Sequence, residues 1–296
     1  MAFDGIVLSR VTELLNETIV TGRISKLYQI SKYELLMTVR AQNENKKLLV
    51  SIHPMYARVQ LTQLNYPTPD FPNALTMFLR KHIEGSFIER IEQVGLDRIL
   101  KITLRGRNEF KDLVEYHLYI EIMGKHSNFI LTNKEDKILE CLKRVSPSDS
   151  IRIMQPGITY SYPPLLEKKN PFENRPETTN LVKEFEGFSK DLAEEIASRM
   201  EQGEDFKTIM NEIKESKELY ITRDDKEKYH VIPLHCFGKK IDQYSLFDGL
   251  DAYYQFIDQK DRIKQQTSDI LHFIQKEYTK NVNCLLYTSD AADDKA

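Results

Sequence analysis

The sequence contains no tryptophan, and cysteine, glycine and proline are all sparse. Its 296 residues include 3 cysteines, 11 glycines and 11 prolines. So few glycines and prolines exclude a collagen-like or low-complexity chain. Cys141, Cys236 and Cys284 are far apart and odd in number, which indicates neither a disulfide framework nor a zinc knuckle. Because HExxH and CxxC motifs are also missing, we expect no metal site and no cofactor.

Long hydrophobic runs are missing too. Runs such as Phe129-Ile130-Leu131 are short, and none approaches the roughly 18 residues that a membrane span needs. The first residues, Met1-Ala2-Phe3-Asp4-Gly5, place an acid where a signal peptide needs basic residues, and no apolar segment follows. We therefore expect a cytoplasmic protein without a membrane partner.

Sequence signatures of catalysis are absent. The chain has no GxSxG, no glycine-rich phosphate loop, no recognisable Cys–His spacing and no kinase signature. No pair of carboxylates stands out as a general acid and base. A DNA glycosylase-lyase of the helix–hairpin–helix type would need an amine nucleophile beside a carboxylate, yet Met1-Ala2-Phe3-Asp4 has neither Pro nor Glu directly after the initiator. We predict a binding protein rather than an enzyme.

The composition that remains is that of a globular protein, with 41% hydrophobic and 29% charged residues and room for roughly two domains. Charge is uneven: residues 1–165 hold 22 Lys and Arg against 18 Asp and Glu, and residues 166–296 hold 20 against 27. Basic residues concentrate at Arg98, Lys101, Arg105, Arg107 and Lys111. This ridge is either a phosphate-binding surface or a solvated strand face.

The hydrophobic pattern predicts an α+β fold with a β-rich first domain, residues 1–165. Helical spacing indicates helices at 6–17 and 73–84. Alternating or β-rich runs indicate strands at 19–30, 33–41, 46–53, 56–62, 86–94, 97–106, 115–123, 127–133 and 137–144. The later strands are hairpin-spaced without intervening helices, which favours an antiparallel sheet or sandwich.

Prolines at 156, 163, 164 and 171 mark a boundary, after which the chain turns helical and acidic. We expect a second domain, residues 166–245, with helices at 178–185, 190–201 and 204–216 and strands near 218–222 and 229–233. A third segment, 246–284, has apolar residues stepping by 4, 3 and 4 from Leu246, as either the start of a coiled coil or a plain amphipathic helix. Residues 285–296 resemble a translated sequencing adapter, and we predict a non-native tail.

Three short segments could bind nucleic acid. Residues 181–193 predict a hairpin of two helices that turns at Gly187 and is capped by Ser189, either presenting amides to phosphates or packing only. Gly95-Leu96-Asp97-Arg98 predicts a turn where Asp97 and Arg98 converge on a ligand, or form a surface ion pair. Residues 121–128 predict a polar loop that contacts a ligand, or an ordinary hairpin turn.

Taken together, these segments and several others resemble one family. The matching residues are Phe3-Asp4-Gly5, Leu79-Arg80-Lys81-His82-Ile83-Glu84-Gly85, Gly95-Leu96-Asp97-Arg98-Ile99, Glu121-Ile122-Met123-Gly124-Lys125-His126-Ser127-Asn128-Phe129-Ile130-Leu131, Ser146-Pro147-Ser148, Pro156-Gly157, Tyr162-Pro163-Pro164 and Asp261-Arg262-Ile263-Lys264-Gln265-Gln266. In this order, from residue 1 to about 283, the chain resembles the NFACT family, which includes ribosome-quality-control factors and fibronectin-binding proteins.

The resemblance implies a glycosylase-like, β-rich N-terminal domain, a helix–hairpin–helix domain and the first helix of a coiled coil. It also implies a factor that binds large ribosomal subunits obstructed by a peptidyl-tRNA nascent-chain complex. Such a factor recruits alanyl-tRNA for template-free C-terminal alanine tailing, while the ribosome performs peptidyl transfer.

For the site, the resemblance implies tRNA engagement by two motifs, Asp97-Arg98 and Glu121-Ile122-Met123. Asp4, Lys125, His126 and Asn128 complete the predicted tRNA-binding residues. Candidate phosphate contacts, from the basic positions, are Arg80, Lys81, Lys101, Arg105 and Arg107. Three alternatives remain open: a fibronectin-binding surface adhesin, a DNA glycosylase-like nucleic-acid-binding protein, and a structural module without a nucleic-acid role.

Overall fold

The computed structural model describes residues 3–148, 150, 152–164, 167–224 and 227–293, with the backbone alone described at 265–266 and 285–293. The chain divides into two compact units, Met1–Asp251 and Ala252–Ala296, each considered by itself. Among the described residues, no helix combines the length and the apolar character needed to cross a membrane.

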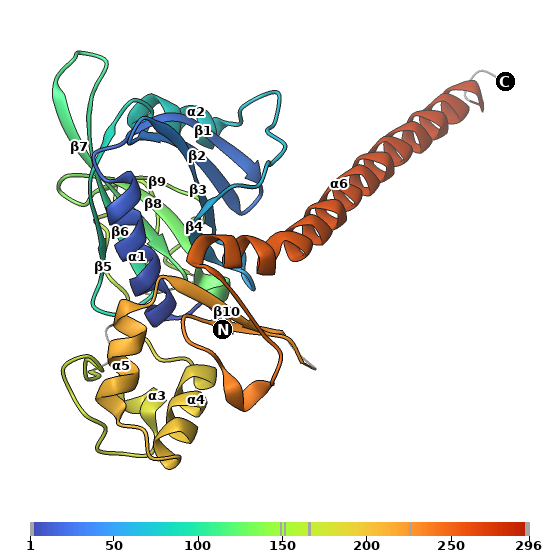
Figure 1. Cartoon of the computed structure of the whole chain (residues 1–296). Coiled ribbons are helices and arrows are strands. Elements are labelled where there is room, and N and C mark those ends of the chain that lie inside the picture. Colours follow the sequence, from blue (N-terminus) through green and yellow to red (C-terminus); the bar gives the residue numbers. More distant parts are fainter. Residues whose placement is uncertain (1–2, 149, 151, 165–166, 225–226, 294–296) are drawn as a thin grey trace. The chain divides into compact units, whose positions relative to one another are not determined.

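A nine-stranded sheet is the larger of the two sheets among the described residues of the first unit (Figure 1). Its strands are β1 (Arg23–Ser31), β2 (Glu34–Ala41), β3 (Glu44–Ser51), β4 (Arg58–Thr62), β5 (Phe87–Gln93), β6 (Ile99–Arg107), β7 (Leu113–Glu121), β8 (Asn128–Asn133) and β9 (Ile138–Cys141). They lie in the order β4-β3-β2-β1-β5-β6-β7-β8-β9, and every neighbouring pair is antiparallel. The predicted antiparallel sheet is therefore confirmed.

Helix α1 (Gly5–Ile19) packs against this sheet because one of its faces is apolar. Its residues Ile6, Val11 and Leu15 are fully buried. Asp4 caps the helix by accepting a hydrogen bond from the Val7 amide (2.9 Å). Helix α2 (Ala74–Ile83) contacts β1 and β6 and is capped in the same way by Asn73.

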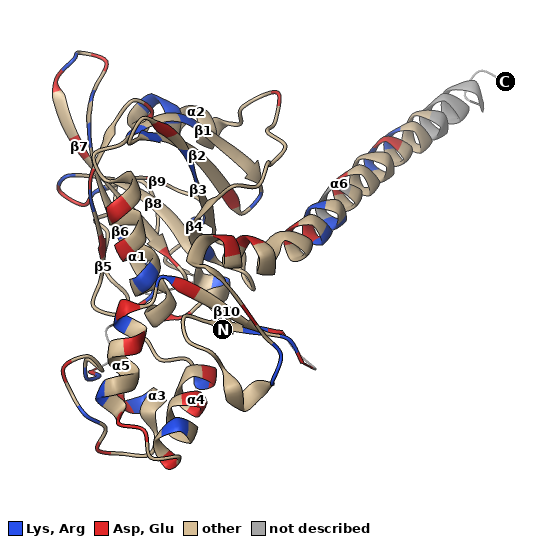
Figure 2. Ribbon diagram, viewed as in Figure 1, with Lys and Arg blue, Asp and Glu red and all other residues tan. Residues whose placement is uncertain are grey.

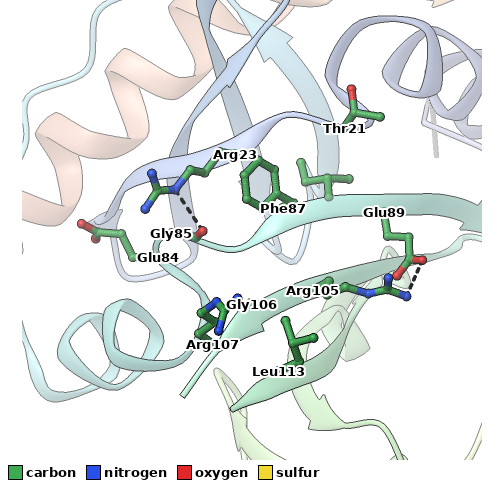
Figure 3. Close-up of a pocket in the computed structure, with 11 residues that line it drawn as sticks. Thr21, Arg23, Glu84, Gly85, Phe87, Glu89, Arg105, Gly106, Arg107 and Leu113 are labelled. Carbon is green, nitrogen blue, oxygen red and sulfur yellow. Dashed lines mark hydrogen bonds and ion pairs between the residues drawn. The ribbon is translucent and has the colours of Figure 1, made fainter. Parts of the chain in front are cut away.

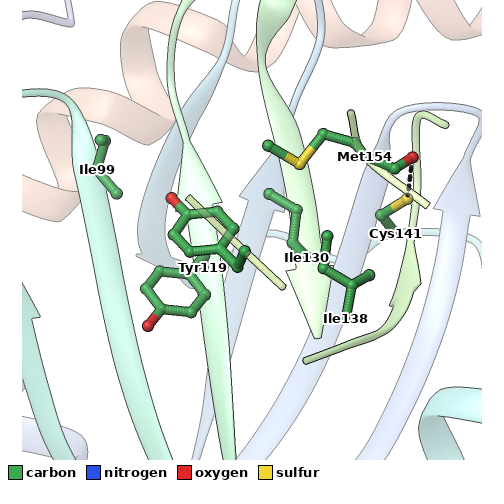
Figure 4. Packing of buried hydrophobic residues seen from close by; sticks show 7 residues of the cluster. Ile99, Tyr119, Ile130, Ile138, Cys141 and Met154 are labelled. Atoms are coloured by element: carbon green, nitrogen blue, oxygen red, sulfur yellow. Dashed lines mark hydrogen bonds between the residues drawn. The ribbon is translucent and has the colours of Figure 1, made fainter. Parts of the chain in front are cut away.

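One half of the sheet holds its own hydrophobic cluster, shown in Figure 4. Neighbouring strands contribute Ile99, Tyr119 and Ile130, and the segment after β9 covers them with Met154 and Tyr160. Because that segment supplies apolar side chains to a strand face, the face is shielded from water. The segment that carries Met154 and Tyr160 is thus part of the sheet's core, and isolated bridges such as Val145–Met154 and Lys137–Thr159 connect it to its neighbours.

The rest of the first unit is mainly a small helical group and a three-stranded sheet. The elements are α3 (Leu181–Glu184), α4 (Lys190–Glu201), α5 (Phe206–Glu215), β10 (Glu218–Thr222), β11 (Lys228–His230), the 3-10 turn η2 (His235–Phe237) and β12 (Ile241–Ser245). The sheet order is β11-β10-β12. Another 3-10 turn, η1 (Gly124–His126), connects β7 to β8 of the large sheet.

Helix α6 (Leu246–Asp293) begins in the first unit and makes up the described part of the second. In the first unit its Asp251 accepts hydrogen bonds from Gln60 (2.6 Å), Thr62 (2.7 Å) and the Gln63 amide (2.9 Å). In the second unit, exposed apolar side chains include Ile263, Ile270 and Ile274.

Three elements differ from the predictions. Strand β12 was not predicted, because Ile241-Asp242-Gln243-Tyr244-Ser245 is mostly polar and becomes a strand by pairing with β10. The predicted helix 178–185 is a single turn, α3. Helix α6 was predicted to end near residue 283, but it continues to Asp293. The longer helix agrees with the lack of a helix-stop residue near 283. The domain boundaries and the tail at 285–296 remain predictions, and residues 294–296 lie outside the described residues.

Candidate nucleic-acid-binding site

The two central motifs lie side by side where β6 begins and β7 ends. Ile99 pairs with Glu121 across the two strands. Immediately beyond this pair, the Ile122 amide donates a hydrogen bond to the Arg98 carbonyl (2.8 Å). The Asp97-Arg98 segment and the Glu121-Ile122-Met123 segment are therefore held together through the backbone, although more than twenty residues separate them in the sequence.

Asp97 and Arg98 sit in a tight turn and are both partly exposed. The Asp97 amide donates to the Val94 carbonyl (3.0 Å), and the Asp97 carboxylate accepts from the Arg98 amide (2.7 Å). Gln93 braces the turn, since its side-chain amide donates to the Asp97 carbonyl (2.9 Å). The turn also requires Gly95, whose φ of +56° lies in the left-handed region.

Glu121 is buried and its carboxylate is fully engaged within the protein. The Arg152 guanidinium forms a two-pronged ion pair with it, one prong at 2.9 Å, and the Tyr160 hydroxyl donates to it (2.8 Å). Tyr160 in turn stacks on Tyr119, with ring centroids 3.9 Å apart. Burial opposes the charge on Arg152, but the contacts with Glu121 outweigh burial and raise the pKa of the guanidinium. The pKa of Tyr160 is raised, mainly by burial and in addition by the charge of Glu121.

The rest of the second motif divides into buried and exposed residues. Ile122 is fully buried, and Met123 packs against the Ile99–Tyr119 cluster. Lys125 and His126 are exposed on the turn η1. Asn128 is buried: its side-chain oxygen accepts from the Lys143 amide (2.9 Å), and its side-chain nitrogen donates to the Lys143 carbonyl (2.8 Å).

Asp4 lies in the interior rather than at the surface. Besides capping α1, its carboxylate accepts from the Ser189 amide (3.1 Å) and contacts the His230 ring (3.2 Å). Burial alone would raise its pKa, but the His230 charge and these hydrogen bonds outweigh burial and lower the pKa of Asp4. Asp4 therefore joins the start of α1 to the hairpin turn before α4 and to β11.

The adjacent Gly5 brings three of these segments into contact. A Cβ at Gly5 would collide with the Leu96 carbonyl oxygen and lie 2.6 Å from the Gly187 Cα. The Gly5 amide donates to the Gly187 carbonyl (3.1 Å), and Glu186 accepts from the Leu96 amide (3.2 Å). The N-terminal segment, the Asp97-Arg98 turn and the helical hairpin thus pack as one unit.

A small cavity opens beside this turn. It has a volume of about 190 Å³ and is lined by residues from the turn, the helical hairpin and the segment between them. Asp97, Lys168 and Glu186 give it charged walls of both signs. The cavity is large enough for a small polar group, such as part of a nucleotide, next to the Asp97 carboxylate.

The predicted phosphate contacts do not gather at this end of the sheet. Lys101 lies nearest, with its ammonium 5.4 Å from the centre of the Tyr119 ring. Arg105 and Arg107 lie toward the far end of β6, about 20 Å and about 26 Å from Ile99 at the usual rise of about 3.3 Å per residue. Arg105 pairs with Glu89 (2.7 Å) and Lys81 with Glu109 (3.1 Å), so these basic residues lie beside acidic ones. Figure 2 shows basic and acidic positions interspersed along the ribbon. Arg80 rests on the Tyr28 ring, 4.9 Å from its centre.

Sequence reasoning missed the residues that hold the site in place. Arg152, Tyr160 and Gln93 have no local motif, and their partners lie in other elements. The described residues contain no group of three or more His, Cys, Asp and Glu that could hold a metal ion. The turn and η1 offer hydrogen-bonding and charged groups, among them Asp97, Arg98 and Lys125.

These features define an α+β protein whose N-terminal antiparallel sheet carries a braced polar turn at one end. The sequence model described as NFACT N-terminal and middle domains matches residues 4–292. The chain therefore belongs to the NFACT family.

Two curated bacterial relatives of similar identity share one name. The "Rqc2 homolog RqcH" of Bacillus subtilis (strain 168) is 38% identical over 307 residues, covering 96% of this chain and 54% of that protein. The protein of the same name from Streptococcus pneumoniae serotype 2 is 36% identical over 297 residues, covering 95% and 53%. The chain thus spans about half the length of the curated relatives it matches.

Solved structures agree on the fold. The N-terminal part of the fibronectin/fibrinogen-binding protein from Streptococcus suis superposes with a TM-score of 0.77 at 35% identity, covering 86% of this chain and 99% of that structure. The fold and the family are therefore supported independently by structure and sequence.

Proposed function

We propose that this chain is part of a ribosome-quality-control factor that binds obstructed large ribosomal subunits. In this proposal it recruits alanyl-tRNA for template-free alanine tailing of the stalled nascent chain, in the cytoplasm where ribosomes work. The support is the family membership and the 36–38% identity to RqcH relatives over nearly the whole chain.

The contact residues in this proposal are the exposed and partly exposed ones. Asp97 and Arg98 face the tRNA from the braced turn, and Lys125 and His126 from η1. An arginine can contact phosphate or stack on an unpaired base, and a carboxylate can accept from a ribose hydroxyl or a base amine. Glu121, Ile122, Asn128 and Asp4 support them from within, because their side chains are buried.

One observation carries this assignment: the Ile122 amide holds the Arg98 carbonyl. This bond makes the position of Arg98 depend on the second motif, and Glu121 is fixed in turn by Arg152 and Tyr160. Two motifs that act on one tRNA would need such a connection. The chain would position its substrate and leave peptidyl transfer to the ribosome, so we do not propose an enzyme.

The same proposal interprets the domains. Helices α3 and α4 joined at Gly187, with φ of +77°, and Ser189 capping α4 (3.3 Å to the Leu192 amide) fit a helix–hairpin–helix domain. The nine-stranded sheet with α1 would be the glycosylase-like domain. The exposed apolar residues of α6, such as Ile263 and Ile270, would meet a second helix in a coiled coil.

A second function has one observation in its favour. The similar structure from Streptococcus suis is that of a fibronectin/fibrinogen-binding protein. Fibronectin is therefore an alternative partner for this chain.

A co-sedimentation and retention experiment distinguishes the ribosome-quality-control function from the fibronectin-binding alternative. The chain is mixed with purified large subunits that carry peptidyl-tRNA, with vacant large subunits, and with immobilised fibronectin. The proposal predicts pelleting with the obstructed subunits above the vacant ones. Retention on fibronectin with no preference for obstructed subunits would favour the alternative and contradict the proposal.

A further inference from the structure

A row of side chains crosses the sheet far from the Asp97-Arg98 turn. The pairing register places Arg40 opposite Arg23, Arg23 opposite Phe87, and Phe87 opposite Arg105, on strands β2, β1, β5 and β6. Directly opposed residues in antiparallel strands point to the same face. All four are exposed, so the row presents one aromatic ring flanked on both sides by arginines.

Phe87 is unusual for a residue at the centre of a wide sheet. Its side chain is 52% exposed, whereas the next residue, Ile88, is buried and fills the opposite face. The burial pattern of β5 places position 87 on the solvent side, where the strand does not need an aromatic residue for its packing. Leu113, which is 71% exposed, lines the same cavity as Phe87, and a contact with another molecule would account for two large apolar side chains exposed at one place.

The arginines are arranged around this ring. Arg23 donates from Nε to the Gly85 carbonyl (3.0 Å), and its guanidinium lies where a Cβ at Gly85 would come within 3.3 Å. Arg107 donates to the Lys111 carbonyl (2.9 Å). A hydrogen bond thus holds each of these two guanidinium groups in position. Because the groups are already ordered, less conformational entropy is lost when they bind a ligand.

Three residues of the row, Arg23, Phe87 and Arg105, line an open cavity of about 680 Å³ (Figure 3). Its lining includes Arg23, Arg105 and Arg107 against Glu84 and Glu89, and Glu89 is paired with Arg105 (2.7 Å). Phe87 and Leu113 supply the apolar surface. The cavity therefore combines a net positive charge with an exposed ring face.

We propose that this cavity binds an unpaired segment of RNA, with a base stacked on Phe87 and the flanking phosphates contacting Arg23, Arg105 and Arg107. Arginines two strands apart lie roughly 10 Å from each other, which leaves room for a base between them. A positively charged groove with an aromatic platform is the usual means of holding single-stranded nucleic acid. An acidic peptide would use the arginines but would gain nothing from the ring.

This surface goes beyond the proposed function, because it lies at the opposite end of β6 from Arg98. A tRNA or ribosomal RNA that engages the Asp97-Arg98 turn need not reach it. The two sites can be tested separately with ligands of different size.

The test uses the absence of tryptophan from the chain. In the 296-residue chain, Phe87→Trp provides a single indole at the centre of the cavity, and stacking of a base quenches its emission. The probes are six-nucleotide oligoadenylate and oligouridylate at low salt. A hexaglutamate peptide tests the acidic-peptide alternative. Phe71→Trp is the matched control, because Phe71 is 87% exposed and does not line the cavity.

We expect saturable quenching of Phe87→Trp by the RNA hexamers, with no quenching by hexaglutamate and none in Phe71→Trp. Quenching should weaken as salt rises. In the chain without tryptophan, Phe87→Ala should weaken binding of a fluorescein-labelled hexamer about fivefold or more, while Phe71→Ala leaves it unchanged. Equal quenching in both tryptophan variants, none in either, or quenching by hexaglutamate would overturn the proposal.

The variant Arg98→Ala tests whether RNA binding at the Phe87 cavity is independent of the Asp97-Arg98 turn. The substitution should leave the RNA-hexamer quenching of Phe87→Trp unchanged, since Arg98 is at the other end of the strand. Hexamer quenching without tRNA or subunit binding would contradict the proposed function alone. Subunit binding without hexamer quenching would contradict this inference alone.

Discussion

The Asp4 carboxylate and the His230 ring meet at 3.2 Å in the interior of the protein, 226 residues apart in the chain. The lowered pKa of Asp4 means that the carboxylate is ionised and accepts from His230 Nε2. The other ring nitrogen of His230 is buried, and no described residue accepts from or donates to it. Through Asp4, the first helix, the hairpin turn at Ser189 and β11 are fixed to one another.

Replacing Asp4 should therefore destabilise the whole first unit. Asp4→Asn removes the charge and weakens the contacts to His230 and Ser189, with an expected loss of about 1–3 kcal/mol in the free energy of unfolding. Urea denaturation measures it. The control is Asp205→Asn, because Asp205 caps α5 from an exposed position and should cost about 1 kcal/mol at most. Equal losses in the two variants would contradict the interior role of Asp4.

The same group predicts how stability depends on pH. The folded-state pKa of Asp4 is below the ordinary value of 3.8, so its contribution is present above about pH 4 and is lost as the pH falls through the folded-state pKa. The melting temperature of the natural chain should thus fall more steeply than that of Asp4→Asn between about pH 5 and pH 3. Parallel melting curves over this range would show that Asp4 is not the group responsible.

Glu121 should prove structural. Glu121→Ala leaves the Arg152 guanidinium without its partner in a mostly buried site, which should cost about 3 kcal/mol. Glu109→Ala, which breaks an exposed pair with Lys81, should cost about 1 kcal/mol at most. Thermal and urea unfolding compare the two. The double variant Glu121→Ala, Arg152→Met should recover part of the loss, and no recovery would refute the ion-pair explanation.

Asp251 should hold the start of α6 to β4. Asp251→Ala strands the buried side chains of Gln60 and Thr62 and should cost about 2–3 kcal/mol. Asp248→Ala removes one exposed bond to Ser245 on the same helical turn and should cost about 1 kcal/mol or less. Hydrogen exchange of the β4 amides gives a second measurement, with faster exchange expected only in Asp251→Ala. Unchanged exchange would mean that other contacts anchor the helix.

The elements of the large sheet were predictable because each strand has its own hydrophobic pattern and the connections are short. Strand β6 alternates apolar and polar residues from Leu100 to Arg105, a pattern that is visible without knowledge of a distant partner. Strand β12 was not predictable for the opposite reason: Asp242 and Gln243 carry no β signal, and the strand exists because β10 pairs with it. The hydrophobic pattern of a segment does not predict a strand that forms because a distant strand pairs with it.

The candidate site likewise divides into features that the sequence predicts and features that it does not. The motifs around Asp97 and Glu121 could be found from the sequence, but which of their side chains point outward could not. Glu121 is buried because Arg152 and Tyr160, 31 and 39 residues later, return to cover it. The ridge predicted from Arg98 to Lys111 extends beyond β6 at both ends. Alternation places Lys101, Arg105 and Arg107 on one face of the strand, but it does not show which acidic partners, such as Glu89, lie beside them.

The central claim is that Arg98 contacts tRNA, and the binding of the 296-residue chain to purified tRNA-Ala tests it most directly. Fluorescence anisotropy at two salt concentrations should show affinity that falls as salt rises. Arg98→Ala should weaken binding about tenfold while changing the unfolding free energy by no more than about 1 kcal/mol. Lys214→Ala, an exposed lysine on α5, should change neither. Binding that survives Arg98→Ala unchanged, or is insensitive to salt, would contradict the account.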